Sequence, residues 1–407
     1  MSEDDATKRV TTRRSAIKGG TALLGGGLLA GCSGGGRDGS TMTGETTSDA
    51  MGGETTSTEG GSYAVTMSPM GKVLFDDVPE RVYAGQPNTV DMAVAAGKAD
   101  ALDAMYYPEY NGTVLDHFYA RLDGVSLDWS ELENAWGMGP EGFYELDSDV
   151  HLTDPAYAST LQTLDADDVT NIGDDVGPWF GNYYSGAHTA PPAAYEGDYE
   201  YYGLWEIAAR VAEVFRAGAR HDALAEEHAA LRTTIEEGLP PADERPSAAL
   251  VFPGQDGTLW AYHLNAPGFL CAHTRPLGAT DAFGDDEWSG TTKQVDYETM
   301  LDRDPDVLLV LFTMASSYRI ADVRAELEDD PVASEISAVQ NDRVYAQGVR
   351  YQGPIVSLFQ TEMTAKQLYP DAFGTWPRYV DGEDYPEIPA DERLFDRGHV
   401  ANAVTSE

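Results

Sequence analysis

The chain has 407 residues, enough for two domains that each have a core of their own. Its formal net charge is −43, from 26 Lys and Arg residues against 69 Asp and Glu residues. So acidic a surface excludes nucleic-acid binding, which requires a basic patch. Because concentrated salt screens the self-repulsion of such a surface, the composition predicts a halophilic protein.

The first 32 residues are typical of an export signal and are not part of the fold. Arg13 and Arg14 resemble the paired arginines of the twin-arginine route, and the apolar run after them is too short to span a membrane. The run ends at Cys32, in a sequence that resembles a lipoprotein cleavage box. We therefore expect a protein lipid-anchored through Cys32 on the extracellular face of the membrane. Residues 33–62 are rich in Gly, Ser and Thr and predict a flexible tether.

Residues 63–198 predict a first α/β lobe. Alternating apolar residues predict a hairpin over 63–67 and 71–75, and strand, helix and strand follow in the order of a βαβ unit, with Thr89 capping the helix. A short helix and a strand are predicted over 140–153. Another strand is predicted over 169–172, followed by an aromatic loop over 177–186. This alternation is typical of a parallel sheet.

Residues 199–240 predict two connecting helices. Apolar residues recur at steps of three and four between Leu204 and Phe215, and a second helix is predicted from a cap at Asp222 to Glu237. The pair is either an ordinary amphipathic hairpin or a rigid connection between two lobes. Residues 241–400 predict the second α/β lobe, with strands over 247–252, 260–263, 307–312 and 343–346, a helix over 354–368, and a tail over 401–407. Cys271 is predicted to be a small buried residue without a disulfide partner.

Two stretches of the chain echo each other. Glu141 and Glu298 each open a short helix that ends in Asp-x-Asp before an apolar strand, at a constant spacing along both stretches. The echo is either chance similarity between two helix–strand junctions or a sign of two similar lobes.

The order of several motifs resembles the substrate-binding proteins of ABC importers for ferric siderophores, haem and cobalamin, in a haloarchaeal form. The motifs are 79–82 before the first strand, the helix–strand junction in each lobe, the central helix pair, 275–279, 341–345 and the closing helix from 353 to 370. None is diagnostic alone, and together they cover residues 70–375. The resemblance implies an α/β fold of two Rossmann-like lobes joined by a long rigid helix, with a ligand cleft between the lobes.

In that architecture the ligand contacts lie where strands end and face the cleft. Aromatic rings would cover flat organic groups, and arginine would pair with carboxylates. The alternative is that these residues pack locally or pair with surface carboxylates. The predicted contacts are Tyr106, Trp179, Tyr183 and Tyr184 in the first lobe, and Trp260, Tyr318, Arg319, Arg350 and Tyr351 in the second.

The resemblance also implies function and partners. The protein would capture a ferric siderophore, or cobalamin or haem, and deliver it to an ABC permease and its ATPase. It would be a monomer with no resident cofactor or metal and no enzymatic activity. Glu141 and Glu298 would dock on the permease; the alternative is that each merely favours a helix N-terminus.

Two other functions remain open. A metal-ion receptor would gather histidines at ligand spacing, but the eight histidines are scattered. A lipid-anchored secreted enzyme would need catalytic chemistry, but the chain has no nucleophile elbow, phosphate loop, dinucleotide fingerprint or metal-hydrolase motif.

Overall fold

The computed structural model describes residues 61–406 apart from 255–256, 285–287, 289 and 316–317. The predicted export signal and Cys32 lie outside the described residues. Within the described part of the chain, no helix combines the length and apolar character that crossing a membrane requires.

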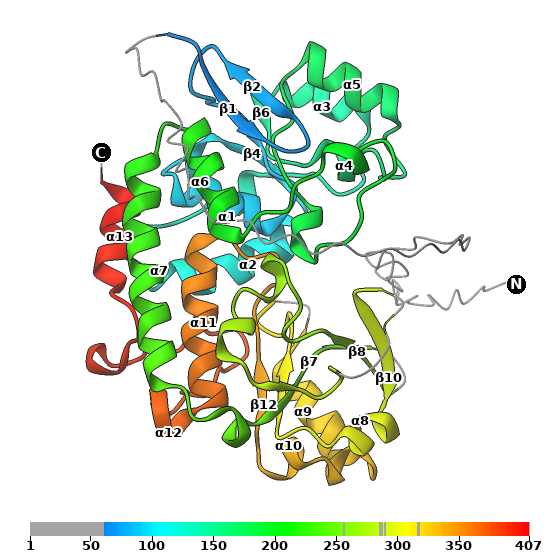
Figure 1. The fold of residues 1–407 in the computed structure, drawn as a ribbon, viewed down its shortest axis with the longest axis vertical. Helices are drawn as coiled ribbons and strands as arrows, with labels where there is room; N and C mark the ends of the chain where they lie inside the picture. The colour runs from blue at the N-terminus through cyan, green and yellow to red at the C-terminus, as the bar shows by residue number, and fades with distance from the viewer. Residues whose placement is uncertain (1–60, 255–256, 285–287, 289, 316–317, 407) are drawn as a thin grey trace, which may run out of the picture. The chain divides into compact units, whose positions relative to one another are not determined.

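The N-terminal lobe is built on a parallel sheet (Figure 1). The predicted hairpin is formed by β1 (Tyr63–Met67) and β2 (Gly71–Phe75). The sheet has the order β5-β4-β3-β6, and all its pairs are parallel. Its strands are β3 (Val82–Tyr83), β4 (Leu102–Met105), β5 (Glu133–Asn134) and β6 (Val150–His151).

Proline defines where most helices of this lobe begin. The helices are α1 (Pro87–Ala95), α2 (Pro108–Tyr119), α3 (Pro140–Leu146), α4 (Pro155–Ala158) and α5 (Ala166–Asp175). Proline is favoured at the first helical position, where its missing N–H has no intrahelical partner. The predicted cap at Thr89 is therefore wrong: α1 already begins at Pro87, and the Thr89 hydroxyl donates to the Gln86 carbonyl over 2.9 Å.

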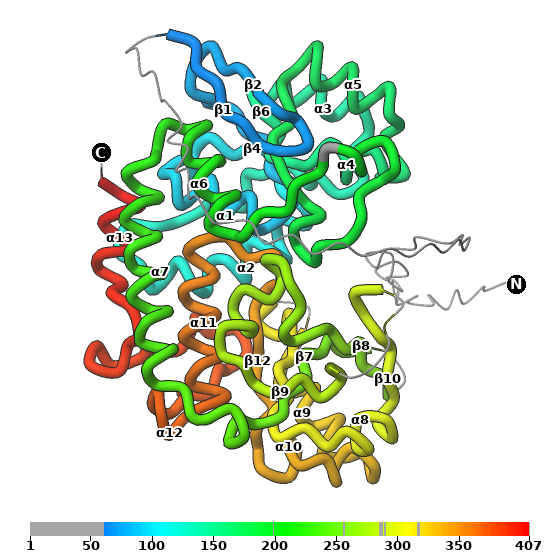
Figure 2. The backbone as a smooth tube through the Cα atoms, viewed as in Figure 1, coloured from blue at the N-terminus to red at the C-terminus, as the bar shows by residue number. Residues whose placement is uncertain are grey.

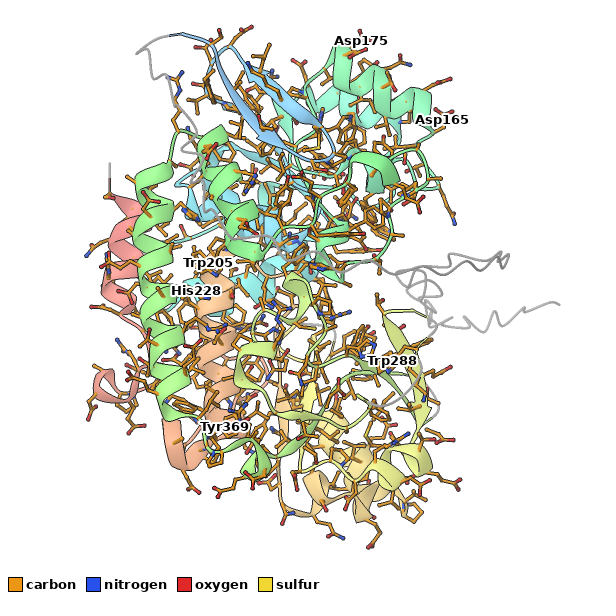
Figure 3. The ribbon with its side chains drawn as sticks, in the orientation of Figure 1. Asp165, Asp175, Trp205, His228, Trp288 and Tyr369 are labelled. Atoms are coloured by element: carbon orange, nitrogen blue, oxygen red, sulfur yellow. The ribbon has the colours of Figure 1, made fainter. Side chains whose placement is uncertain are left out.

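The strand predicted over 169–172 is also wrong, because these residues lie in α5. Asp165 and Asp168 form a capping box that starts this helix, and Asp165 and Asp175 mark its two ends in Figure 3. Val169 and Ile172, three residues apart, then face the core of the lobe. Two β-branched residues fit a strand and a helix face equally well.

Two helices connect the lobes, α6 (Leu204–Val214) and α7 (Gly218–Gly238). The second begins at Gly218, so Asp222 lies inside it and is not its cap. In Figures 1 and 2, α7 runs alongside both lobes as one uninterrupted helix. Trp205 of α6 stacks on His228 of α7 with ring centroids 4.4 Å apart, as Figure 3 marks, which fixes the two helices to each other.

The C-terminal lobe has a mixed sheet with the order β10-β8-β7-β11-β12, and β9 pairs with β7. All four residues of β11 are buried, as expected for a central parallel strand. The strands are β7 (Ser247–Pro253), β8 (Thr258–Tyr262), β9 (Thr280–Asp281), β10 (Thr292–Asp296), β11 (Val307–Val310) and β12 (Val344–Ala346).

The helices that follow close the fold. They are α8 (Tyr297–Arg303), α9 (Ile320–Asp329), α10 (Ser337–Gln340), α11 (Pro354–Leu368), α12 (Pro370–Phe373) and α13 (Arg397–Thr405). Every residue of α11 is buried, and this helix contacts α1, α2 and α6 as well as α7. The fold class predicted from the sequence, two α/β lobes joined by a long helix, is confirmed.

The C-terminal segment, residues 376–405, touches both lobes, and we call it the C-terminal strap. The Asp381 carboxylate accepts the first amides of α9, from Ile320 over 2.9 Å and Ala321 over 3.1 Å. The amide of Tyr385 donates to the His117 carbonyl of α2 over 3.1 Å. The predicted tail over 401–407 is wrong in its bounds, because α13 continues to Thr405 and packs on α7.

The echo in the sequence extends to the hydrogen bonds. Both short helices end at an aspartate in the left-handed region, Asp147 with φ 49° and Asp304 with φ 42°. Two residues later, the Asp149 carboxylate accepts the amide of Arg81 just before β3, and the Asp306 carboxylate accepts the amide of Ser247 at the start of β7. This favours two similar lobes over chance.

Candidate functional site

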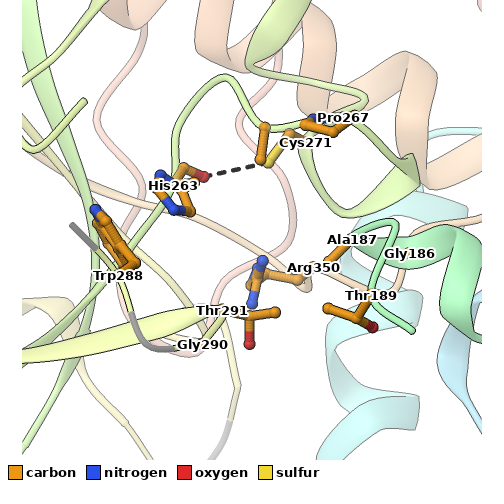
Figure 4. A pocket seen from close by; sticks show the side chains of 11 residues that line it. Gly186, Ala187, Thr189, His263, Pro267, Cys271, Trp288, Gly290, Thr291 and Arg350 are labelled. Atoms are coloured by element: carbon orange, nitrogen blue, oxygen red, sulfur yellow. Dashed lines mark hydrogen bonds between the residues drawn. The ribbon is translucent and has the colours of Figure 1, made fainter. Parts of the chain in front are cut away.

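A cavity of about 390 Å³ lies where the two lobes meet (Figure 4). Gly186, Ala187 and Thr189 line it from the segment between α5 and α6, on the side of the first lobe. The second lobe supplies the remaining lining residues, His263, Ala266, Pro267, Cys271, Trp288, Gly290, Thr291 and Arg350. A cavity of this volume that is lined from both lobes has the size of a small-molecule site.

Arg350 brings a positive charge to the cavity. Its side chain reaches the cavity from the loop after β12, and only 8% of the residue is exposed. The guanidinium carbon lies 4.1 Å from the centre of the Tyr262 ring, in cation–π contact. Its Nε is buried and has no hydrogen-bond partner in the described part of the chain.

One wall of the cavity is aromatic. The rings of His263 and Trp288 lie 3.8 Å apart, and the indole N–H of Trp288 donates to the Phe283 carbonyl over 3.1 Å. Burial lowers the pKa of His263, Asp281 opposes this shift, and Arg350 adds to it. His263 is therefore neutral at pH 7 and presents an uncharged ring.

Cys271 forms another part of the lining. Its thiol donates to the His263 carbonyl over 3.2 Å, the contact drawn in Figure 4. Burial raises the pKa of this thiol, so it stays protonated and is not an activated nucleophile.

The two lobes touch beside the cavity through a pair of tyrosines. The Tyr351 hydroxyl donates to the Tyr183 hydroxyl over 2.8 Å, and their rings stack at 5.8 Å. Tyr157 stacks on the other face of Tyr183 at 4.0 Å, while the Asp154 carboxylate accepts the Tyr183 amide over 2.8 Å. Tyr183 is thus held by its own lobe and bonded to the other.

A second aromatic contact joins the lobes. Tyr110 of α2 packs against Phe312 at 5.8 Å and Tyr318 at 6.4 Å between ring centroids. Phe252 of β7 completes this cluster. Sequence reasoning missed Tyr110 because it predicted no helix over residues 108–119. Pro108, followed by apolar residues at helical spacing, was the available signal for α2.

The predicted contact residues separate into two groups. Arg350 lines the cavity, Tyr183 and Tyr351 form the inter-lobe bond, Tyr318 lies in the second aromatic contact, and Tyr184 packs beside Tyr183.

The other four lie elsewhere. Trp179 and Tyr106 are buried in the core of the first lobe, where the Trp179 indole donates to the Val169 carbonyl over 2.8 Å. Arg319 is exposed and pairs with Asp381 of the C-terminal strap at 3.7 Å. Trp260 is half-buried within β8, opposite Phe252 and Gln294. None of these four lines the cavity, and of the nine predicted contacts only Arg350 does.

Sequence reasoning also missed His263, Trp288, Thr189 and Cys271 as cavity residues. His263 is one of the eight scattered histidines, and no motif sets Trp288 apart from the other tryptophans. In the part of the chain that the structure describes, no group of three or more His, Cys, Asp or Glu side chains is placed to hold a metal ion.

Glu141 and Glu298 occupy matching positions. Each is exposed in the first turn of its short helix, α3 or α8. Their carboxylates are available to solvent and to a partner.

Known proteins share this fold. Residues 176–350 match the family model described as periplasmic binding protein. The chain is similar in structure to the molybdate-bound MolA of Haemophilus influenzae, with a TM-score of 0.56 at 19% identity over 76% of this chain and 92% of that one.

It is also similar to a periplasmic binding protein of Veillonella parvula, with a TM-score of 0.53 at 16% identity over 76% of this chain and 92% of that one. The nickel-bound CeuE of Helicobacter pylori gives 0.53 at 12% identity, over 76% and 90%. No curated protein matches the chain. At these identities the likeness shows the two-lobe periplasmic binding protein fold.

Proposed function

We propose that this protein is the substrate-binding component of an ABC importer and that it captures an iron chelate. A ferric siderophore is the first candidate, with haem or cobalamin as related ligands. The observation that carries the proposal is the cavity between the lobes, which receives residues from both of them. A ligand there touches both lobes at once and so determines how they sit together, which a permease can sense. The match of residues 176–350 to periplasmic binding proteins supports this role.

In this proposal the protein is not an enzyme. Cys271 is a protonated, buried thiol that contacts the backbone carbonyl of His263 and not its ring. The His263 ring is neutral, and its Nδ1 lies 3.9 Å from Asp281, so the two side chains do not form an activated Cys–His pair. The protein would work as a monomer, exported by the twin-arginine route and anchored by lipid on Cys32 outside the membrane.

The test is a titration of the purified protein in high salt with ferric hydroxamates, ferric catecholates, haem and cobalamin. Trp288 lines the cavity, so its fluorescence should change on binding. Saturable binding of at least one ligand is expected. Flat titrations with all of them would refute capture of an iron chelate or corrinoid.

Partner docking is tested separately. Glu141 and Glu298 lie at matching exposed positions, one on each lobe, as two-point docking on a permease requires. Replacing both with alanine should abolish uptake in cells while ligand affinity stays unchanged. Exposed Glu145, also on α3, gives the control Glu145→Ala, which should transport normally. Lost ligand binding with intact transport would contradict the assignment.

A further inference from the structure

Arg350 is a buried charge for which the described part of the chain offers no counter-charge. It has no ion pair there, and its one strong contact is with the uncharged ring of Tyr262. Burying an uncompensated charge is costly, because water no longer solvates it. An arginine guanidinium also keeps its charge, so it cannot escape this cost by losing a proton.

The acidic residue beside the cavity is already engaged. The Asp281 carboxylate accepts the Leu264 amide over 2.8 Å and the Phe283 amide over 2.9 Å. Among the residues that the structure describes, none that lines the cavity is acidic. In a chain with a formal charge of −43, this is a local positive site. Because the described residues supply no counter-charge, we expect the ligand to supply it.

The positive charge of Arg350 affects the pKa values of neighbouring side chains. Burial, with Arg350 as the second cause, lowers the pKa of His273 to about 3. Burial raises the pKa of Tyr183, and the Tyr351 hydrogen bond and the Arg350 charge oppose this rise. His263 and His273 are thus neutral, and Arg350 supplies the positive charge of the site.

The cavity limits the size of the ligand. The lobes already touch beside the cavity, through the Tyr183–Tyr351 bond. A Cβ atom on Gly268 would lie 2.3 Å from the Gly186 carbonyl, so the loops there are in close contact. A ligand larger than the cavity would have to separate these contacts between the lobes.

We infer that the ligand is a compact anion whose carboxylate or other oxyanion group binds the Arg350 guanidinium, with the rest of the ligand against the His263–Trp288 wall. This inference rests on the proposed function and narrows it. A small, negatively charged ferric chelate built on carboxylates fits the site, whereas bulky neutral chelates do not. A metal-free oxyanion shares the same chemistry, so the two sources must be separated by experiment.

The experiment is a fluorescence titration of the full chain in high salt. The probes are ferric citrate, iron-free citrate, molybdate, a neutral ferric trihydroxamate and cyanocobalamin. They are tested on the wild type and on Arg350→Gln, which removes the charge. Arg232→Gln is the matched control, since Arg232 of α7 does not line the cavity and pairs with Glu236. Arg350→Lys keeps the charge but loses the planar fork.

We expect the anions to bind and the neutral probes not to bind. Arg350→Gln should weaken anion binding on the order of 10- to 100-fold, the worth of a hydrogen bond to a charged group. The affinity of Arg350→Lys for the anions should lie between those of the wild type and Arg350→Gln. The affinity of Arg232→Gln should match that of the wild type. Preference for ferric over iron-free citrate would identify a chelate. A preference for iron-free citrate over ferric citrate, or for molybdate, would identify a free oxyanion as the ligand. That result would support the anion site and overturn iron capture.

Two results would overturn the inference. If the neutral chelates bind the wild type, or if Arg350→Gln binds anions as tightly as the wild type, the anion site is wrong and the receptor proposal stands. If no probe binds the wild type, the iron-chelate proposal fails and the anion site fails with it. Thermal unfolding of each variant excludes misfolding as the cause of lost binding.

Discussion

The C-terminal strap depends on a buried ion pair, and breaking this pair gives a sharp test of the structure. Glu362 of α11 is fully buried, and its carboxylate lies 2.9 Å from the Nη2 atom of Arg397 in α13. The same carboxylate accepts the Leu394 amide over 2.7 Å and the Tyr385 hydroxyl over 2.9 Å. Three contacts from the strap therefore meet on one side chain of α11.

The perturbation is Glu362→Gln, which keeps the size of the side chain and removes its charge. Arg397, only 4% exposed, would then be a buried cation that has lost its counter-charge. Breaking a buried pair in this way costs about 3–5 kcal/mol. Adding Arg397→Met removes the orphaned charge, so the double variant should be more stable than Glu362→Gln alone. An exposed pair contributes at most about 1 kcal/mol, so Glu236→Gln on α7, which breaks the exposed Arg232–Glu236 pair, is the control.

The assay is urea unfolding at constant high salt, followed by tryptophan fluorescence. Trp376 reports on the strap because its ring lies 5.2 Å from that of Tyr385. A loss of free energy of unfolding below about 1 kcal/mol in Glu362→Gln would show that the pair is not desolvated. A double variant whose loss equals the sum of the two single losses would refute the coupling.

Three further outcomes are expected. Burial raises the pKa of the Asp91 carboxyl to about 7, although hydrogen bonds from Tyr119 and Val356 oppose this shift, so the protonated carboxyl stabilises the fold fully below pH 4 and this stabilisation is lost as the pH rises to about 7. Asp91→Asn should remove this pH-dependent part, up to about 4 kcal/mol, from the free energy of unfolding. An unchanged pH profile of unfolding would contradict the prediction. Tyr183→Phe removes the inter-lobe hydrogen bond, worth about 1 kcal/mol, and should broaden the distribution of distances between spin labels on the two lobes. Tyr144→Phe, at an exposed position, should leave that distribution unchanged. In low salt the protein should lose stability, and unchanged stability would contradict the halophilic prediction.

Elements with strong boundary signals could be predicted from the sequence. The bounds predicted for α11 are those of the structure, because Pro354 opens it and Pro370 follows its end. The sequence of β11 predicted a buried strand because it is a continuous run of Val and Leu, which is typical of a central parallel strand. By contrast, α5 is short and has only two buried apolar residues, so the spacing of its apolar residues fits a helix and a strand equally well.

The site could be predicted only in part, because burial and pairing depend on the tertiary structure. Arg319 and Arg350 look equivalent in the sequence, yet one is exposed and paired with Asp381 while the other is buried without a partner. Trp179 and Trp288 both lie next to glycine-containing loops, and only the fold puts the first in a lobe core and the second in the cavity wall. Residue type narrows the candidates, and the fold selects among them.

The acidic surface and the single cation of the cavity fit together if the protein works in concentrated salt. At about 1 M salt the Debye length is about 3 Å, so the surface carboxylates would repel an approaching anion only at contact. Inside the cavity the guanidinium is shielded from the solvent, and there its attraction is screened much less. The surface charge would then serve solubility in brine, and one buried arginine would decide which ligands bind. If affinity for the anions in the titration falls steeply between moderate and high salt, the binding charge is exposed to solvent and this division of roles is wrong.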